Sequence, residues 1–511
     1  MQPVVTAEEM RALDHATMTD VGLPGLTLME TAGRAVAAAA RRALHRRGHV
    51  AVVCGPGNNG GDGFVIARVL RDHGVDAIAY LAAPREAVKG DARTHLEILE
   101  KAGGVVRMIG TPAQLDELGA AIAGAEVCVD ALFGIGPVRP IEGHLAEVVG
   151  AINRARIVIA VDVPSGIDSD TGRTMGTAVQ AHRTVTMGAW KVALASAPGF
   201  AAAGDVEVCD IGIPAGVLAT AGVKAGLVEE RDVRGWLPTP APLDHKGTRG
   251  HAVIIGGNPG MRGAGRLAAA AALRAGAGLS TLAAEGGADL TAVDSVMTKA
   301  IDGSLAELLK GKSAIVIGCG LGQGERARAW VAEVLAAGVP AVLDADALNV
   351  LAEDATRIAS AAGPIVITPH PGEAARLLGP ACTAAEVEAD RLAAARALAG
   401  KTRAIVVLKG ARTIVCDGTL ADDFCAINPT GDPALSSGGS GDVLAGVIGG
   451  LLAQGVAAAD AARAGVYVHG LAGERLGAVH GRGALSADLP LTIASVIAQL
   501  VERAGQTSTR T

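Results

Sequence analysis

Residues 49–63, HVAVVCGPGNNGGDG, give the clearest indication of how this chain folds. The apolar run at 49–54 has the length and composition of a strand buried on both faces, and Gly55 ends it. A loop of glycine and asparagine follows, and an apolar helical pattern begins at Phe64. A strand that passes through a polar loop into a helix is the repeating unit of a parallel α/β sheet, which binds ligands at the carboxyl ends of its strands. Turn formation by Asn and Gly is the alternative interpretation of this loop.

The same alternation of short apolar runs and helical patterns continues along the chain. A helix capped by Thr6 and a second helix near 27–46 precede the first strand, and further strands are expected at 77–81, 105–109, 127–129, 157–161, 183–186 and 205–208. After a proline-rich loop at 238–247, strands are expected at 251–255, 314–317, 341–344, 365–368, 405–409 and 413–416, with helices at 263–275 and 443–453. The sequence therefore predicts two α/β domains, 1–222 and 223–511, the first with a Rossmann-like, doubly wound parallel sheet.

The composition limits the classes of partner. Half of the 511 residues are hydrophobic, only 2% are aromatic, and the formal net charge is −7. This indicates neither a basic surface for nucleic acid nor aromatic platforms for base stacking. The N-terminus lacks the pattern of a signal peptide, and no apolar run has the length of a membrane span. We expect small-molecule substrates, no nucleic-acid or membrane partner, and a cytoplasmic location; a homo-oligomeric assembly is also expected.

The seven cysteines are spread singly along the chain. An odd count without a CxxC pair indicates neither a disulfide framework nor a zinc site. We expect most of them to be small buried hydrophobic residues in a reducing compartment.

Polar residues end two further strands of the N-terminal half. Asp130 stands at the end of one strand, before a glycine-rich loop, and Asp162 ends the next, with Ser165 close behind it. Because the carboxyl ends of parallel strands lie at one edge of the sheet, these side chains are placed for catalysis. The oxygens of Asn59, Asp130 and Ser165 suit a hard cation such as potassium, magnesium or calcium. Capping and turn formation by Asp and Ser are the alternative.

The segments GPGNNGGDG, VDALFGIG and AVDVPSGIDSDTG closely resemble the NAD(P)H-hydrate epimerase family, over about residues 1–220. The resemblance implies that Asp162 is the acid–base residue and that Asn59, Asp130 and Ser165 ligate potassium. It also implies that the substrate is contacted by Asn58, Asn59, Gly60, Gly61, Asp62, Gly134, Ile135, Gly136, Pro137, Val138, Arg139, Pro140 and Asp162. A carboxylate such as Asp162 can shuttle the proton while the C6–O bond of a hydrated nicotinamide opens and re-forms on the other face.

In the C-terminal half, residues 437–446 (SGGSGDVLAG) combine a glycine-rich loop with the expected start of a helix. Such a loop favours a bound phosphate. Asp442 is then a helix cap or a general base beside the phosphate, and the surrounding glycines favour the base. Lys409, at a strand end, either meets a phosphate or is a solvated surface lysine. His370, restrained between two prolines, has either a structural role or a contact with a ligand.

The segments GGNPGMRGAGRLAAAAALRAGAGLSTL, TPHPGEAARLL and SSGGSGDVLAGVIGGLLAQG look like the ADP-dependent NAD(P)H-hydrate dehydratase family, from about residue 230 to 500. The resemblance implies a ribokinase-like fold, ADP as co-substrate, magnesium, and Asp442 as a catalytic residue in contact with the substrate. It further implies hydrate contacts by Ala264, Gly322 and His370, and nucleotide contacts by Lys409, Gly410, Ala411, Arg412, Thr413 and Gly441. Cys319, where the family usually has proline, and residues 436–437 depart from the family pattern.

Together the two resemblances imply a bifunctional enzyme that repairs hydrated NADH and NADPH. The N-terminal domain would interconvert the R and S epimers, and the C-terminal domain would dehydrate the S epimer with ADP. One alternative is a ribokinase-like kinase acting on a vitamin or a sugar. The other is a non-catalytic N-terminal binding module of the kind that occurs in RNA-decay scaffolds; the presence of Asn58–Asp62, Asp130 and Asp162 counts against it.

Overall fold

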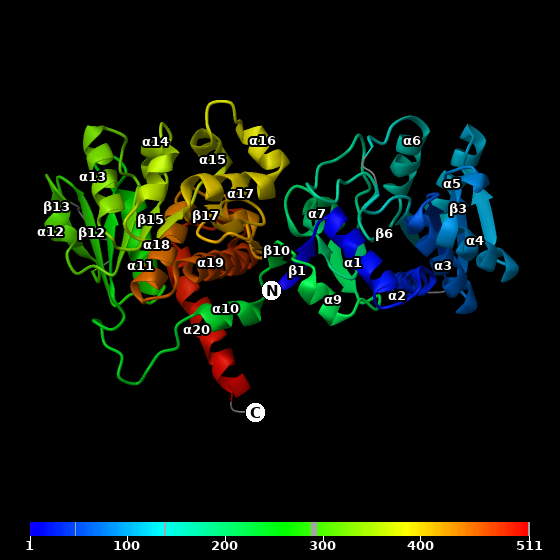
Figure 1. Ribbon diagram of the computed structural model, residues 1–511, viewed down its shortest axis with the longest axis horizontal. Coiled ribbons are helices and arrows are strands. Elements are labelled where there is room, and N and C mark those ends of the chain that lie inside the picture. The colour runs from blue at the N-terminus through cyan, green and yellow to red at the C-terminus, as the bar shows by residue number, and fades with distance from the viewer. Residues whose placement is uncertain (46–47, 137–138, 288–293, 509–511) are drawn as a thin grey trace. The chain divides into compact units, whose positions relative to one another are not determined.

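The computed structural model describes residues 1–45, 48–136, 139–287 and 294–508 (Figure 1). The chain forms two compact units, one of Gln2–Val223 and one of Lys224–Thr511 together with Met1. Within the described ranges, no helix combines the length and the apolar character that crossing a membrane requires.

A parallel sheet forms the centre of the N-terminal unit, in the order β4-β3-β2-β5-β6-β7-β9. Its strands are β2 (His49–Cys54), β3 (Asp76–Leu81), β4 (Val105–Met108), β5 (Val127–Ala131), β6 (Val158–Val161), β7 (Arg183–Met187) and β9 (Asp205–Cys209). The central strands β5 and β6 are buried throughout, as expected for a parallel sheet covered on both faces. The strand order reverses between β2 and β5, and ligands bind at such a switch point.

Helices cover both faces of this sheet. On one face, α1 (Ala7–Thr19), α2 (Gly25–Ala43), α3 (Asn58–Asp72) and α4 (Gly90–Lys101) share an apolar cluster with Val50 and Val52 of β2. The alternate residues Ala51 and Val53 belong to the opposite cluster, with α5 (Pro112–Gly124) and α6 (Gly143–Ile152). The predicted doubly wound sheet is therefore confirmed. The smaller elements are β1 (Gln2–Val5), η1 (Arg85–Ala87), β8 (Trp190–Lys191), α7 (Val192–Ala195), α8 (Phe200–Ala203) and α9 (Ala215–Thr220).

The asparagine loop after β2 is shorter than predicted, because α3 begins at Asn58 rather than at Phe64. Gly57 precedes the first turn, and no side chain caps it. The turn packs so closely on the strand end that a Cβ at Gly60 would lie 1.8 Å from the carbonyl oxygen of Gly55. Asn58–Asp62 therefore form the amino end of a helix rather than a free loop.

The C-terminal unit is built on a second sheet, in the order β13-β12-β11-β14-β15-β16-β17-β18-β19-β10. Neighbouring strands are parallel from β13 to β17, the next two pairs are antiparallel, and β10 pairs with β19 in parallel. The bounds are β10 (Ala225–Leu227), β11 (His251–Ile255), β12 (Leu279–Glu285), β13 (Met297–Ile301), β14 (Ala314–Ile317), β15 (Ala341–Leu343), β16 (Ile365–Ile367), β17 (Ile405–Leu408), β18 (Ile414–Asp417) and β19 (Cys425–Ile427). The predicted α/β class is confirmed for this half too.

Long helices pack on this second sheet. α11 (Arg262–Arg274), α18 (Ser440–Ala453), α19 (Ala458–His480) and α20 (Leu489–Ser508) share one apolar cluster with β11 and β14. α11 and α18 approach so closely that a Cβ at Gly446 would lie 2.2 Å from the carbonyl oxygen of Ala268. The other helices are α10 (Glu230–Trp236), α12 (Ala306–Leu309), α13 (Glu325–Ala336), α14 (Asp346–Leu351), η2 (Ala355–Ser360), α15 (Pro371–Leu378), α16 (Ala384–Ala389), α17 (Arg391–Thr402), η3 (Pro433–Leu435) and η4 (Gly481–Gly483).

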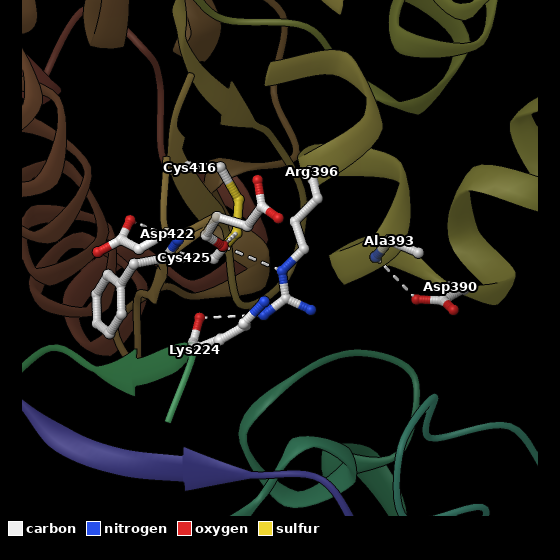
Figure 2. Close-up of a disulfide and its surroundings, with 9 residues drawn as sticks. Lys224, Asp390, Ala393, Arg396, Cys416, Asp422 and Cys425 are labelled. Carbon is white, nitrogen blue, oxygen red and sulfur yellow. Dashed lines mark hydrogen bonds between the residues drawn. A yellow bond between two sulfur atoms is a disulfide. The ribbon is translucent and has the colours of Figure 1, made fainter. Parts of the chain in front are cut away.

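Two of the cysteines are paired, a single disulfide that the sequence, which indicated no disulfide framework, did not predict. Cys416 of β18 and Cys425 of β19 lie opposite each other in the antiparallel ladder, with their Cα atoms 4.3 Å apart, and form a disulfide. Figure 2 shows this bridge beside the side chain of Arg396, which donates hydrogen bonds to the carbonyl oxygens of Asp423 and Lys224. No sequence signal marked the pair, because it depends on the register of two strands. Most of the others, Cys54, Cys128, Cys209 and Cys319, are buried as expected.

Candidate active sites

A cavity of about 990 Å³ lies at the carboxyl ends of the N-terminal strands. Its walls come from α1, from α2 and from the segments that follow β2, β5 and β6. Among the residues predicted to contact substrate, those in the wall are Asn58, Asn59, Asp62, Gly134, Ile135, Gly136, Arg139, Pro140 and Asp162. Gly60 and Gly61 are buried in the packing behind it and do not line it. Pro137 and Val138 lie outside the described residues.

Asp162 ends β6 in an unusual backbone conformation, with φ at 67°. Its Oδ1 lies 2.6 Å from the Nζ of Lys191 and accepts a hydrogen bond from the Thr186 hydroxyl at 3.1 Å. The backbone N–H of Met187 also donates to this oxygen, at 3.4 Å. A buried carboxylate needs such partners, because burial removes the water that would otherwise stabilise its charge. The side chain remains 11% exposed, where it meets the cavity.

Lys191 is a site residue that the sequence reasoning missed. Its side chain is fully buried, and besides Asp162 its ammonium donates to the Thr186 hydroxyl at 3.0 Å and to the Met187 carbonyl at 2.7 Å. The residue belongs to β8, a strand of only two residues. The one available signal was a single lysine next to the apolar run Val192–Ala195.

Two more carboxyl groups, Asp14 and Asp62, line the same cavity. Burial, reinforced by the charges of Asp162 and Asp14, raises the pKa of Asp62 well above its ordinary value. Burial also raises the pKa of Asp14, to about 6. The positive charge of Lys191 opposes this rise, and the negative charge of Asp162 adds to it. The sequence reasoning missed Asp14 too. The signal was its place on α1 one turn from Met10, which also lines the cavity.

The three predicted potassium ligands come from three separate strand ends. Ser165 donates to Asp130 twice, from its hydroxyl at 2.6 Å and from its backbone N–H at 2.8 Å. Asn59 Oδ1 and Asp162 Oδ2 each lie 3.1 Å from the position of a Cβ built on Gly134, so both side chains lie against this loop. Asp130 is fully buried, makes no ion pair with any described residue, and has its pKa raised to about 6 by burial. An uncompensated buried carboxyl group among oxygen donors fits a hard cation.

In the C-terminal unit, Asp344, Thr368 and Lys409 follow the adjacent strands β15, β16 and β17. The Lys409 Nζ lies 2.6 Å from Asp344 Oδ1 and 3.9 Å from Glu373 Oε2, and the Thr368 hydroxyl donates to Asp344 at 2.8 Å. Burial lowers the pKa of Lys409, but the charges of Asp344 and Glu373 outweigh it and raise that pKa overall. The interpretation of Lys409 as a solvated surface lysine is therefore wrong.

Asp442 lies in the first turn of α18, which begins at Ser440 rather than at the predicted Val443. Gly439, with φ at 92°, occupies the capping position, and no side chain caps the helix. The interpretation of Asp442 as the helix cap is therefore wrong. Burial raises the pKa of Asp442 to about 6, and the charge of Asp344 adds to the effect, while a hydrogen bond with Cys319 opposes it.

The amino end of α18, Lys409 and Asp344 meet at one place. A Cβ at Gly441 would lie 3.4 Å from Lys409 Nζ and 3.8 Å from Asp344 Oδ2. The thiol of Cys319 and the carboxyl groups of Asp344 and Asp442 come within 4.8 Å of one another. Uncapped helix N–H groups, an ammonium and a carboxyl group of raised pKa are the groups that phosphoryl transfer to an alcohol requires.

The other residues predicted for this site lie on nearby loops and helices. Gly410, Ala411, Arg412 and Thr413 form the turn between β17 and β18. Gly322 donates its N–H to Asp346 at 2.8 Å, and Ala264 lies on α11. His370 caps α15, since its Nδ1 accepts from the N–H groups of Gly372 at 3.0 Å and Glu373 at 3.4 Å. The histidine therefore has a structural role, and its ring is 52% exposed.

Two buried polar side chains that the sequence did not mark support this site. The guanidinium of Arg391 donates to the carbonyl oxygens of Leu408 at 3.2 Å and Lys409 at 3.1 Å, which fixes the end of β17. His469 contacts the carbonyl oxygen of Ser440 through Nε2 at 3.0 Å. Burial lowers the pKa of His469 to about 4, so the ring is neutral. Both residues lie far in sequence from the site residues that they contact, so the sequence did not reveal their roles.

Two family models match the chain. One described as NAD(P)H-hydrate dehydratase covers residues 252–495, and one described as YjeF-related protein N-terminus covers residues 25–193. The bifunctional NAD(P)H-hydrate repair enzyme Nnr of Moorella thermoacetica is 40% identical over 95% of this chain and 94% of its own length. The Escherichia coli enzyme of the same name is 35% identical over 96% of this chain and 93% of its own. The solved ADP/ATP-dependent NAD(P)H-hydrate dehydratase from Bacillus subtilis is 29% identical, with a TM-score of 0.46, over 54% of this chain and 97% of that one.

Proposed function

The chain belongs to the family of bifunctional NAD(P)H-hydrate repair enzymes, and from this premise we propose that it returns hydrated NADH and NADPH to their active forms. The N-terminal domain, residues 1–222, interconverts the R and S epimers of the hydrate. The C-terminal domain, residues 223–511, dehydrates the S epimer with ADP as co-substrate. Joining the two activities lets one chain consume both epimers.

The cavity of the N-terminal unit supports the epimerase assignment. Opening the C6–O bond of the hydrate creates a cationic ring, which the carboxyl groups of the wall stabilise. Asp162, beside Lys191, is placed to move a proton during this exchange. The uncapped amino end of α3 at Asn58 suits the pyrophosphate of the nucleotide, because helix N–H groups and the helix dipole favour anions.

Potassium belongs to this proposal for the N-terminal unit. Asn59, Asp130 and Ser165 would hold it through amide, carboxylate and hydroxyl oxygens, the donor chemistry that hard cations take. The buried carboxyl group of Asp130 would then gain the counter-charge that the described residues do not supply. When bound, the cation would supply a fixed positive charge that orients the loops around the substrate.

For the dehydratase, one observation carries the proposal: Asp442 stands in the first turn of an uncapped helix without capping it. Asp442 takes the proton from the C6 hydroxyl, and this oxygen attacks the terminal phosphorus of ADP. The P–O bond to AMP breaks, and a phosphorylated hydrate forms. The C6–O bond then breaks with phosphate as the leaving group, and loss of the neighbouring proton restores the dihydronicotinamide.

Groups described above would neutralise the negative charge of the phosphates in this step. The N–H groups at the start of α18 and the ammonium of Lys409 meet the phosphates, and the loop from Gly410 to Thr413 holds the nucleotide. Magnesium would be held by phosphate and water oxygens with help from the carboxyl groups of Asp344 and Asp442, and would neutralise phosphate charge.

The experiment uses the full chain and a mixture of both hydrate epimers, and it follows the return of dihydronicotinamide absorbance with and without ADP. We expect complete recovery with ADP and none without it. Asp162→Ala should leave the R epimer unconsumed while the S epimer is still converted. A stable phosphorylated product would instead identify a kinase and overturn the dehydratase assignment.

We further propose that the enzyme acts in the cytoplasm as a homo-oligomer and binds no nucleic acid or membrane. The net charge of −7 and the 2% aromatic content support the absence of a nucleic-acid partner. Light scattering after size-exclusion chromatography measures the assembly directly, and a monomer at all concentrations would contradict it.

A further inference from the structure

The epimerase cavity holds more proton-carrying groups than a single acid–base residue requires. Asp14 reaches it from α1, Asp62 from α3, Asp162 from the end of β6 and Lys191 from β8. The oxygen that leaves C6 and the oxygen that returns to it lie on opposite faces of the nicotinamide ring. A group on one face cannot both protonate the departing hydroxyl and accept the proton of water arriving at the other face, so two groups are needed.

Resting on the proposed epimerase function, we propose that Asp14 is a second catalytic proton-transfer residue, acting with Asp162 on opposite faces of the ring. Lys191 is then the positioning residue that holds the carboxyl group of Asp162 in place. The neutral carboxyl group of Asp14 donates its proton to the leaving hydroxyl. The C6–O bond breaks, its electron pair stays on oxygen, and water forms. Water then adds to the other face, and the carboxylate of Asp162 takes its proton. Proton exchange with solvent resets the two carboxyl groups.

The carboxyl groups of Asp162 and Asp14 differ in the number of hydrogen-bond donors around them. Asp162 Oδ1 has three donors: the ammonium of Lys191, the hydroxyl of Thr186 and the N–H of Met187. Such a set stabilises the charged form. Asp14 has no comparable set, because its Oδ1 is buried without a hydrogen-bond partner while its side chain lines the cavity. A buried oxygen without a partner favours the neutral acid, which avoids the cost of an unsolvated charge.

The charged groups around Asp14 act on its pKa in both directions. Asp162 and Lys191 face it with opposite effects, and burial is the larger influence, so its pKa rises to about 6. Asp62 lines the same cavity, and burial raises its pKa well above its ordinary value. The remaining charged residues of the wall are Arg11, Asp91 and Arg139. Two carboxyl groups whose surroundings separate their proton affinities are the usual arrangement for an acid and a base in one site.

Lys191 fixes the position of the Asp162 carboxyl group. The ammonium is fully buried and hydrogen-bonded to Thr186 and to the Met187 carbonyl, so its position is fixed before substrate arrives. Thr186 donates to Asp162 and accepts from Lys191, which makes a closed triangle of the three side chains. Removing the ammonium would leave the Asp162 carboxyl group with two neutral donors, the Thr186 hydroxyl and the Met187 N–H.

The test measures consumption of the purified R epimer by the full chain with ADP, and uses dehydration of the S epimer by the same sample as the internal reference. Asp14→Asn keeps the shape and removes the proton. It should lower kcat for the R epimer by at least about 100-fold, the usual range for general acid catalysis, with KM and S-epimer turnover little changed. Glu8→Gln, an exposed substitution on the same helix, is the matched control and should keep wild-type rates.

The pH profile separates a proton-transfer role from a structural one. For the wild type, kcat/KM for the R epimer should fall above about pH 6 as Asp14 loses its proton, and Asp14→Asn should abolish this limb. Lys191→Met should lower kcat for the R epimer with KM little changed, because it removes the contact that fixes Asp162, and Lys191→Arg, which keeps the charge, should retain part of the rate. If Asp14→Asn does not fold, Asp14→Glu replaces it and should displace the same limb of the profile.

The outcomes are distinct. Failure of the wild type to consume the R epimer would overturn the epimerase function itself. If the wild type is active and Asp14→Asn consumes the R epimer within about twofold of it, the assignment of Asp14 is overturned. A wild-type kcat for the R epimer in Lys191→Met would overturn the positioning role of the lysine.

Discussion

Replacing Lys409 by methionine should destabilise the C-terminal unit strongly, and the structure gives the magnitude. The ammonium lies 2.6 Å from Asp344, whose side chain is 2% exposed, so the substitution leaves a carboxylate buried with the Thr368 hydroxyl as its closest remaining donor. Removing one partner of a buried ion pair costs about 3–5 kcal/mol, because the other charge loses its compensation. Methionine keeps the length of the side chain, so lost packing contributes little.

The double variant Lys409→Met/Asp344→Asn separates the charge from the contact. It removes both charges, and we expect it to recover most of the lost stability, which a double-mutant cycle reports as a coupling energy. The assay is hydrogen exchange by mass spectrometry in a urea series, since peptides from β15 and β17 report this unit apart from the other. Arg328→Met is the matched control: its bridge to Glu353 is exposed, and its loss should cost less than about 1 kcal/mol.

Two results would contradict the proposed coupling between Lys409 and Asp344. One is a loss below about 1 kcal/mol for Lys409→Met, which would mean that water or another cation solvates Asp344 in the native state. The other is a double variant as unstable as the sum of both single variants, since additivity would show that the two charges do not interact.

Three further outcomes follow from the site geometry. Asp442→Asn should lower dehydration of the S epimer by about 10²–10⁴-fold without changing epimerisation; in the wild type this rate should fall as pH drops through about 6, because a base with that pKa becomes protonated, as a pH–rate profile will show. Asp130→Asn should abolish any stimulation of epimerisation by potassium, measured by salt titration against sodium, and retained stimulation would contradict the cation site. Gly60→Ala should displace the start of α3, because its Cβ would lie 1.8 Å from the carbonyl oxygen of Gly55, and should lower both epimerase activity and the melting temperature of the N-terminal unit.

The sequence was sufficient to place candidate site residues that stand directly at the end of a recognisable strand. Asp130 and Asp162 follow apolar runs that became β5 and β6, and parallel strands bring such ends together by geometry alone. The start of α3 was misplaced, because asparagine and glycine have low helix propensity and only packing against the strand end makes Asn58–Asp62 helical. The disulfide was missed for a related reason, since the register of β18 and β19 decides it.

Lys191 and Asp14 show where sequence reasoning ends. Each is a charged residue in an otherwise unremarkable segment, and its role depends on what stands opposite it in space. Periodicity could place Asp14 on the same helix face as Met10, but only the fold places that face over the strand ends. Residues of this kind act through burial and charge compensation, which no local pattern encodes.

The two sites use a buried lysine in opposite ways. In the N-terminal unit, the ammonium of Lys191 lies 2.6 Å from an oxygen of Asp162, the proposed base itself. In the C-terminal unit, Lys409 lies against Asp344, and Asp442 stays without a salt bridge among the described residues, with its pKa raised to about 6. The second arrangement suits a base that must take a proton from an alcohol beside phosphate, because a higher proton affinity strengthens the base. The lysine's partner therefore differs between the sites: it is the proposed base in the N-terminal unit and a neighbour of the proposed base in the C-terminal unit.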